Sequence, residues 1–153
     1  MEGLPAHTSV SIDFLLAVID SWDGLGVTNV GPDIFEVLVD GTLVFAAGYN
    51  NFDAADQSAV RGTQLAYDVP LGFGNWNDAA YDMTSVAALH GIAHSSSSMT
   101  VQFRFANPQG IDDESFALEN LRISVNDGTV PEPSMLALLG AGLAGLGLRR
   151  RRI

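Results

Sequence analysis

The feature that most constrains the fold of this chain is a strict alternation of apolar residues near its N-terminus. In the stretch VSIDFLLAVID, apolar side chains recur at every second position, at Val10, Ile12, Phe14, Leu16 and Val18. Successive side chains of a β-strand point to opposite faces of its sheet. The stretch therefore predicts a long strand with one buried face, and no stretch before the C-terminal tail has the pattern of a long amphipathic helix.

Other strand signals follow along the chain. Two apolar runs, 34–39 and 43–46, flank Asp40-Gly41, which predicts a hairpin because a tight primed turn needs positive φ. Residues 99–105 alternate apolar and polar side chains. The last predicted strand, 116–125, changes the phase of its inward face at Glu119-Asn120, which indicates a β-bulge.

The middle of the chain has a weaker pattern. Between Ala46 and Asp82 the sequence is rich in Gly, Asn and Asp, and we expect loops with a short strand over 63–67. Residues 84–89 are expected to form a strand, with one helical turn as the alternative. Short strands separated by turns predict an all-β, jelly-roll-like antiparallel β-sandwich over residues 1–125.

Charge is distributed unevenly along the 153 residues. The chain has no cysteine and no lysine, and all eighteen acidic residues lie at or before Glu132. With three arginines, the part before Ser134 carries −15, whereas the tail carries +4. The acidic body argues against binding nucleic acid, because phosphates would be repelled. It suits a well-solvated exported protein, or one whose carboxylates hold a divalent cation.

The tail has three parts. A linker over residues 126–134 precedes an apolar segment that begins at Met135 and contains Leu136, Leu139, Leu143, Leu146 and Leu148. As a helix, residues 135–148 would span roughly 21 Å, against about 30 Å of bilayer hydrocarbon, so we expect a short transmembrane-type helix. The arginines that follow should stay cytoplasmic and set its topology: Arg149, Arg150, Arg151 and Arg152. A buried C-terminal helix is the alternative, disfavoured by the glycines and the arginine cluster.

The order of motif, apolar segment and basic end resembles a known sorting signal. The motif is Val130-Pro131-Glu132-Pro133, and the whole tail resembles the PEP-CTERM signal of Gram-negative bacteria. The resemblance implies recognition by an exosortase, a membrane-embedded cysteine transpeptidase. It implies an inner-membrane-anchored precursor that is cleaved near the motif and transferred to the cell surface or to an exopolysaccharide matrix.

The body is also similar to a known class of domain. The stretches IDSWDGLG, GPDIFEVLVDG, HSSSSMTVQFRFA and DDESFALENLRISV follow one another in the order found in jelly-roll domains of bacterial surface proteins. The chain departs from that pattern at 116–119, where Phe-Ala-Leu-Glu replaces the usual Trp-Gly-Ile-Asp. The resemblance implies a sandwich related to carbohydrate-binding and lectin-like modules, although a fold alone does not give a function.

Two acidic loops are candidates for a calcium site. Asp20, Asp23 and Asp33 flank a Gly-rich loop, and Asp113 and Glu114 precede the closing strand. Calcium takes six to eight oxygen ligands from carboxylates and carbonyls, and loops at one end of a sandwich could supply them. The spacing is not that of an EF-hand. The alternative is that these residues are solvated turn formers.

Aromatic and histidine residues give weaker signals. Trp76 is expected to be exposed and is a candidate sugar-stacking platform, whereas Trp22, at a strand end, is expected to be a core or hinge residue. The histidines, His7, His90 and His94, are expected to have structural or surface roles. No GxSxG elbow is present, and no carboxylate pair stands out for glycoside hydrolysis.

These observations lead to three hypotheses about function. The first is a non-enzymatic surface or extracellular-matrix protein sorted by exosortase. The second is a carbohydrate-binding, lectin-like module, either with or without a need for calcium, and the third is a hydrolase. Because residues 1–5 have neither a basic nor an apolar character, we expect that the natural protein carries a signal peptide and further strands before Met1.

Overall fold

The structure is a computed structural model that describes residues 1–26, 32–72, 74–106 and 113–127. Eight strands and two single-turn 3₁₀ helices follow one another in these ranges. They are β1 (Ser9–Asp20), β2 (Ile34–Val39), β3 (Thr42–Gly48), β4 (Thr63–Val69), β5 (Asp78–Asp82), η1 (Met83–Ser85), η2 (Ala87–Leu89), β6 (Ile92–Ala93), β7 (Val101–Phe105) and β8 (Glu114–Asn126).

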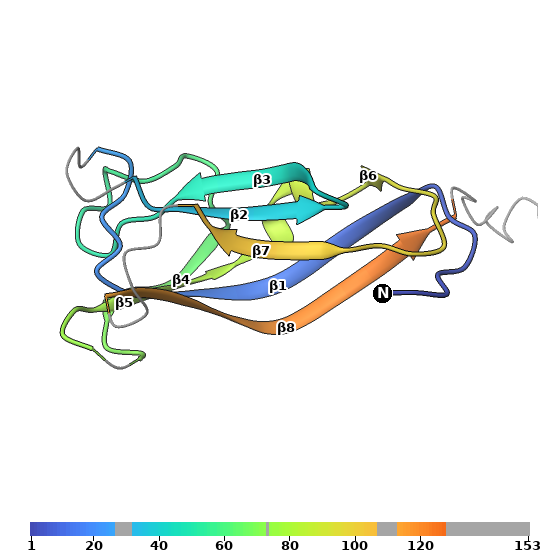
Figure 1. The fold of residues 1–153 in the computed structure, drawn as a ribbon. Coiled ribbons are helices and arrows are strands. Elements are labelled where there is room, and N and C mark those ends of the chain that lie inside the picture. Colours follow the sequence, from blue (N-terminus) through green and yellow to red (C-terminus); the bar gives the residue numbers. More distant parts are fainter. Residues whose placement is uncertain (27–31, 73, 107–112, 128–153) are drawn as a thin grey trace, which may run out of the picture.

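The strands form two antiparallel sheets (Figure 1). In the larger sheet, β1 pairs with β8 along one edge, and its other edge is shared by β5 and the short β6. β4 extends this sheet beyond β5. The smaller sheet has the order β3-β2-β7. The predicted all-β architecture is confirmed at this level, with two sheets arranged as in a β-sandwich, and the jelly-roll connectivity stays a prediction.

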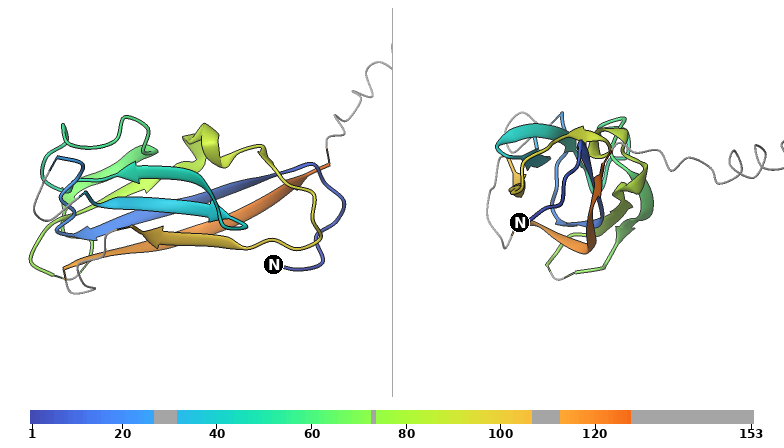
Figure 2. Two further views of the ribbon diagram at one scale, coloured as in Figure 1. Left: turned by 45° about the horizontal axis from the view of Figure 1, so that its top comes forward. Right: turned by 90° about the vertical axis from the view of Figure 1, so that its right-hand side faces the viewer.

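The core lies between the two sheets. Along β1 every second residue is buried, and these are the five apolar residues that the alternation predicted followed by Asp20. From the smaller sheet, Phe35 and Phe103 meet the β1 residue Phe14, with ring centroids 6.0 Å and 5.3 Å from it. Phe116 of β8 contacts Phe35 from the larger sheet, at 5.1 Å. Aromatic side chains thus join the layers that Figure 2 shows from two further directions.

Two local predictions are confirmed. At the β2–β3 turn, Asp40 has φ 49° and Gly41 has φ 79°, the two positive values that a tight primed turn needs. In the β1–β8 pair, the register shifts between Asp13 and Leu15, opposite Asn120, which has φ 55°. The phase change predicted at 119–120 is therefore a β-bulge, and it lets both halves of β8 keep apolar residues against the core.

One prediction is wrong. Residues 84–89 do not form a strand; they span η1 and η2, with Val86 between the two helices. The Asp82 side chain accepts a hydrogen bond from the Thr84 N–H and caps the first turn. The buried residues of this segment are Met83, Val86 and Leu89, and a spacing of three is the period of a 3₁₀ helix rather than the period of two of a strand.

The tail predictions fall on residues that the structure does not describe. Within the described ranges, no helix has both the length and the apolar character needed to cross a membrane. The motif 130–133 and the apolar segment 135–148 lie outside these ranges.

Candidate functional site

Three carboxylates meet at one end of the sandwich, where β1 ends and β2 and β8 begin, on the left of Figure 1. Asp23 lies three residues after β1, Asp33 directly precedes β2, and Glu114 is the first residue of β8. One oxygen from each of these carboxylates lies within 4.8 Å of the other two. Segments far apart in sequence thus converge because the two sheets end at the same place.

Backbone and amide hydrogen bonds hold the first two carboxylates in position. The Asp33 N–H donates to the Gly24 carbonyl oxygen at 2.9 Å, and the Asp23 N–H donates to Asp33 Oδ2. Asn50 donates from Nδ2 to the Asp23 carbonyl oxygen at 2.9 Å. Asn51, which is fully buried, donates from Nδ2 to the Asp20 carbonyl oxygen at 2.7 Å. The loop after β1 is therefore fixed by side chains that the sequence did not single out.

Burial makes this cluster electrostatically unfavourable when all three groups are ionised. Asp33 has 0% and Glu114 has 4% of its surface exposed. Burial raises the pKa of Asp33 to about 6; hydrogen bonds with the Asp23 backbone and the Glu114 side chain oppose this, and the charges of Asp23 and Asp113 add to it. Burial, with the Asp113 charge, also raises the pKa of Asp23. A positive charge placed among these oxygens would remove the repulsion.

A second observation points to a ligand at the same place. Asp33 Oδ1 is buried and has no hydrogen-bond partner among the described residues. Buried carboxylate oxygens are normally hydrogen-bonded or bound to a cation, so an oxygen without a partner in this cluster is compatible with a bound cation. A hard divalent cation such as Ca²⁺ takes carboxylate oxygens of this kind.

The other two residues predicted for the site are placed differently. Asp20 is 4% exposed, and its Oδ1 accepts a hydrogen bond from the Trp76 N–H at 3.2 Å. Asp113 is exposed, and its Oδ1 accepts from Ser21 Oγ at 2.8 Å. The structure thus brings together three of the five predicted carboxylates, while Asp20 and Asp113 are engaged by neighbouring loops.

Asp78 is a buried carboxylate that the sequence analysis missed. Its Oδ1 accepts from the Asp20 N–H at 2.9 Å, and its Oδ2 accepts from the N–H groups of Leu71 and Gly72, each at 2.6 Å. Its partners are backbone donors, so it organises the loop after β4. Its position directly after Asn77, in a loop rich in Gly and Asn, gave no signal that set it apart from a turn residue.

The two tryptophans have the environments that the sequence predicted. Trp22 is fully buried, donates from Nε1 to the Ser115 carbonyl oxygen at 2.9 Å, and stacks on Phe105 at 4.4 Å. Trp76 is 57% exposed. Its ring contacts Phe52, itself 46% exposed, with centroids 5.8 Å apart and planes inclined by 59°. The sequence analysis did not identify Phe52.

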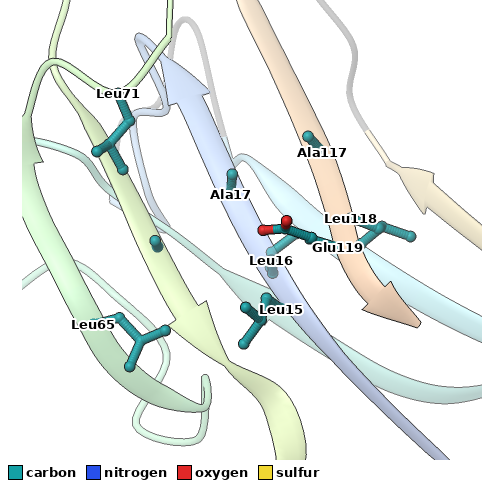
Figure 3. A pocket seen from close by; sticks show the side chains of 9 residues that line it. Leu15, Leu16, Ala17, Leu65, Leu71, Ala117, Leu118 and Glu119 are labelled. Atoms are coloured by element: carbon teal, nitrogen blue, oxygen red, sulfur yellow. The ribbon is translucent and has the colours of Figure 1, made fainter. Parts of the chain in front are cut away.

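An apolar hollow lies on the outer face of the larger sheet (Figure 3). Its volume is about 410 Å³, and Glu119 is the one charged residue among those that line it. Leu15 and Ala17 of β1 form part of the lining, with Leu65 of β4 across from them. The hollow offers apolar contact area but no cluster of polar groups, so the carboxylate end of the sandwich remains the candidate site.

Comparison with known proteins identifies the tail. Residues 129–152 match the family model described as the PEP-CTERM protein-sorting motif. The match covers 24 of the 153 residues and contains the Pro131-Glu132-Pro133 motif, the apolar segment and the arginine cluster. No curated protein and no solved structure matches the chain.

Proposed function

We propose that this protein is an exported substrate of an exosortase. The observation that carries the proposal is the sorting motif at residues 129–152. In the precursor, residues 135–148 hold the chain in the inner membrane of a Gram-negative bacterium, and Arg149–Arg152 keep its end in the cytoplasm. Cleavage near Pro131-Glu132-Pro133 then releases the body to the cell surface or to an exopolysaccharide matrix.

The folded body has the role of a non-enzymatic surface or matrix domain in this proposal. Its two-sheet architecture and its acidic surface suit a module that is displayed in water. The polar partners of its histidines in the described residues are a carbonyl oxygen, aspartates and another histidine, rather than a serine nucleophile.

Processing can be tested directly in cells. The full chain, preceded by a signal peptide and followed by a C-terminal epitope tag, is produced in a strain that carries an exosortase and in the matched deletion strain. We expect the tag to be lost from the extracellular form only when the exosortase is present. Glu132→Ala should accumulate as a tagged, membrane-bound precursor in both strains, with Glu119→Ala as a control in the folded body. Equal processing of Glu132→Ala and wild type would show that the motif is not read.

A second candidate function is favoured by the exposed aromatic pair. Phe52 and Trp76 are both tied to the loops that hold the carboxylates: the Phe52 N–H donates to Asn50 Oδ1, and the Trp76 N–H donates to Asp20 Oδ1. Aromatic faces bind the C–H faces of sugars. A calcium ion at Asp23, Asp33 and Glu114 would fix the same loops. The body would then be a calcium-dependent carbohydrate-binding module.

The aromatic pair gives this second candidate its test. Binding of bacterial exopolysaccharides is followed by isothermal titration calorimetry, with and without calcium. We expect a binding signal that is lost in Trp76→Ala and Phe52→Ala and retained in Leu65→Ala, an exposed apolar residue on β4. Unchanged binding after both aromatic substitutions would exclude the pair as the binding surface.

A further inference from the structure

Two histidines and an aspartate form a continuous hydrogen-bonded chain at the opposite end of the sandwich from the carboxylates. His7 Nδ1 lies 2.6 Å from the Pro5 carbonyl oxygen, and His7 Nε2 lies 2.7 Å from His94 Nδ1. His94 Nε2 lies 3.1 Å from Asp40 Oδ2. The ring planes differ by 11°, and a separation of 2.7 Å between nitrogens is too short for stacked faces, so the two rings meet edge to edge.

The groups at the two ends of this hydrogen-bonded series determine which ring nitrogens of His7 and His94 carry protons. A carbonyl oxygen only accepts hydrogen bonds, so His7 Nδ1 carries a proton, and the ionised Asp40 carboxylate only accepts, so His94 Nε2 carries one too. The contact between the rings needs a third proton between two nitrogens. Three protons on four ring nitrogens are one more than two neutral imidazoles hold. The geometry is therefore complete only when the pair carries a single positive charge.

The charge belongs on His94 rather than on His7. His94 contacts the Asp40 carboxylate, whereas His7 faces a carbonyl dipole, and an opposite charge stabilises an imidazolium more than a dipole does. His7 is 6% exposed and the side chain of His94 is also 6% exposed, so the contact between the rings is shielded from water, whereas the Asp40 side chain is 47% exposed.

This hydrogen-bonded chain joins the segments around the C-terminal end of β8. His7 lies in the N-terminal segment, His94 follows β6, and Asp40 lies in the β2–β3 turn, where its Oδ1 also accepts from the Thr100 N–H. Directly beside His7, the Thr8 N–H donates to the Asn126 carbonyl oxygen at 2.8 Å. In Figures 1 and 2 the start of β1, β6 and the end of β8 lie toward the same end.

We propose that His7, His94 and Asp40 form a proton-dependent clasp that holds the end of the sandwich from which the sorting motif leaves. When both histidines are neutral, the lone pair of His94 Nε2 faces a carboxylate. When both are charged, two N–H groups face each other across 2.7 Å. Either change breaks one of the three contacts, so the clasp is tightest at the pH at which the pair has one charge, within the range in which imidazoles exchange protons, about pH 5 to 8.

The clasp also bears on processing, a consequence that rests on the proposed sorting function. Four residues lie between Asn126 and Pro131, so the five steps along the chain reach at most about 18 Å. While the clasp is closed, the sorting motif is confined to that distance from the folded body. The Thr8–Asn126 contact lies at the last pair of the β1–β8 ladder, beside His7, so we expect this terminal pair to fray when the clasp opens and an enzyme at the membrane to reach the motif more readily.

Other charged groups also lie on the elements around the pair. Four of them form two ion pairs: Asp13 of β1 with His90 of the η2–β6 turn, and Glu36 of β2 with Arg104 of β7. The others are Glu2 in the N-terminal segment, Arg122 in β8 and Asp127 directly after β8. Asp40 makes the direct contact with His94. His90→Gln is a matched control, because it removes an exposed histidine that pairs with a different aspartate, Asp13.

The clasp is tested by nitrogen NMR of the imidazoles in the full chain, solubilised in detergent micelles, between pH 4 and 9. Near pH 6.5 we expect His7 as the neutral tautomer protonated at Nδ1 and His94 as the imidazolium. The second charge should appear only together with loss of the signal for coupling between the rings. Asp40→Asn, which keeps an acceptor for the Thr100 N–H, should lose the charge from the pair at lower pH than wild type. Independent titration of His7 and His94 would overturn the clasp.

Thermal unfolding adds a second readout. The melting temperature of wild type should exceed that of His94→Gln by several degrees near pH 6.5, and the difference should shrink toward both pH 4 and pH 9. A difference that is the same at every pH would mean a purely structural role and would contradict the proposal. His90→Gln should show no such maximum.

The link to processing is tested separately in the exosortase strain. Wild type and Asp40→Asn are compared for precursor cleavage in medium at pH 5, 6.5 and 8, and we expect slowest cleavage of wild type at pH 6.5 and faster cleavage of Asp40→Asn at that pH. Equal rates at all pH values for both proteins, with an intact NMR signature, would overturn the link alone. Absence of exosortase-dependent cleavage from both proteins would overturn the proposed function and this link together, whereas the NMR result would stand.

Discussion

Replacing Asp33 with asparagine separates the cost of the buried carboxylates from the benefit of a bound cation. Asparagine has nearly the shape of aspartate and keeps an oxygen for the Asp23 N–H, which donates to Asp33 Oδ2 in the structure. Its amide would take the place of Asp33 Oδ1, the buried oxygen without a partner among the described residues. The substitution therefore removes the charge and adds a donor beside two carboxylates.

The pKa of Asp33 gives the magnitude. The value in the folded state is about 6, raised from 3.8, so the folded protein binds this proton more tightly than the unfolded chain does. Ionisation of Asp33 thus destabilises the fold, with no penalty below about pH 4 and the full penalty above about pH 6. At about 1.4 kcal/mol for each pKa unit, the penalty approaches 3 kcal/mol. Without calcium, Asp33→Asn should be more stable than wild type at pH 7.5 by up to that amount, and equal to it near pH 4.

Calcium should reverse the order of stability. An ion that binds only the folded state at 100 times its dissociation constant adds about 2.7 kcal/mol, and this increment should appear in wild type but not in Asp33→Asn. The assay is urea unfolding at pH 4 and 7.5, with EDTA or with millimolar calcium. Asp68→Asn, an equal charge change at an exposed residue, is the control. If Asp33→Asn is less stable than wild type in EDTA at pH 7.5 and calcium stabilises neither protein, Asp33 is a structural hydrogen-bond acceptor and not a ligand.

Three further predictions test the loops around the site. Gly24→Ala should lower the free energy of unfolding by more than 2 kcal/mol, because its Cβ would lie 2.2 Å from the Asp56 carbonyl oxygen. Gly41→Ala has the same φ of 79° but nothing within 4 Å of its Cβ, so it should cost only about 1 kcal/mol. Equal costs for the two variants in urea unfolding would contradict this. Asn51→Ala should cost about 2 kcal/mol because it removes two buried hydrogen bonds, to the Val18 and Asp20 carbonyl oxygens, of which the second still accepts from the Trp22 N–H, and a loss under 1 kcal/mol in the same assay would be inconsistent with that role. Trp76→Ala should leave the melting temperature within about 2 °C of wild type, because the ring is 57% exposed, and a larger drop by calorimetry would show that the ring supports the fold.

Much of the fold could be predicted because strand signals are local. The alternation from Val10 to Val18 correctly predicts the buried face of β1, and Asp40-Gly41 correctly predicts the β2–β3 turn. Residues 84–89 were predicted wrongly because the all-β neighbourhood was given more weight than their own apolar spacing of three. A run with Met83, Val86 and Leu89 as its buried residues fits a 3₁₀ helix, and the Asp82 cap supports it.

The candidate site could be predicted only in outline. The sequence shows which loops are acidic, but which carboxylates meet depends on how the ends of two sheets are placed. Asp20 lies on the inward-facing side of β1, and its Oδ1 accepts a hydrogen bond from the Trp76 N–H. Asp23 lies beyond the end of β1, and its N–H donates to Asp33 Oδ2. The His7–His94 contact joins residues 87 positions apart and has no local signal at all.

The central claim, that the C-terminal motif is read and removed, is tested most directly by mass spectrometry of the C-terminus. The protein is purified from the extracellular fraction of a strain with an exosortase, and its C-terminal peptide is sequenced. The claim predicts that this peptide ends near Pro131-Glu132-Pro133, without residues 135–153. An extracellular or surface form that still ends in Arg149–Arg152 and Ile153 would contradict it.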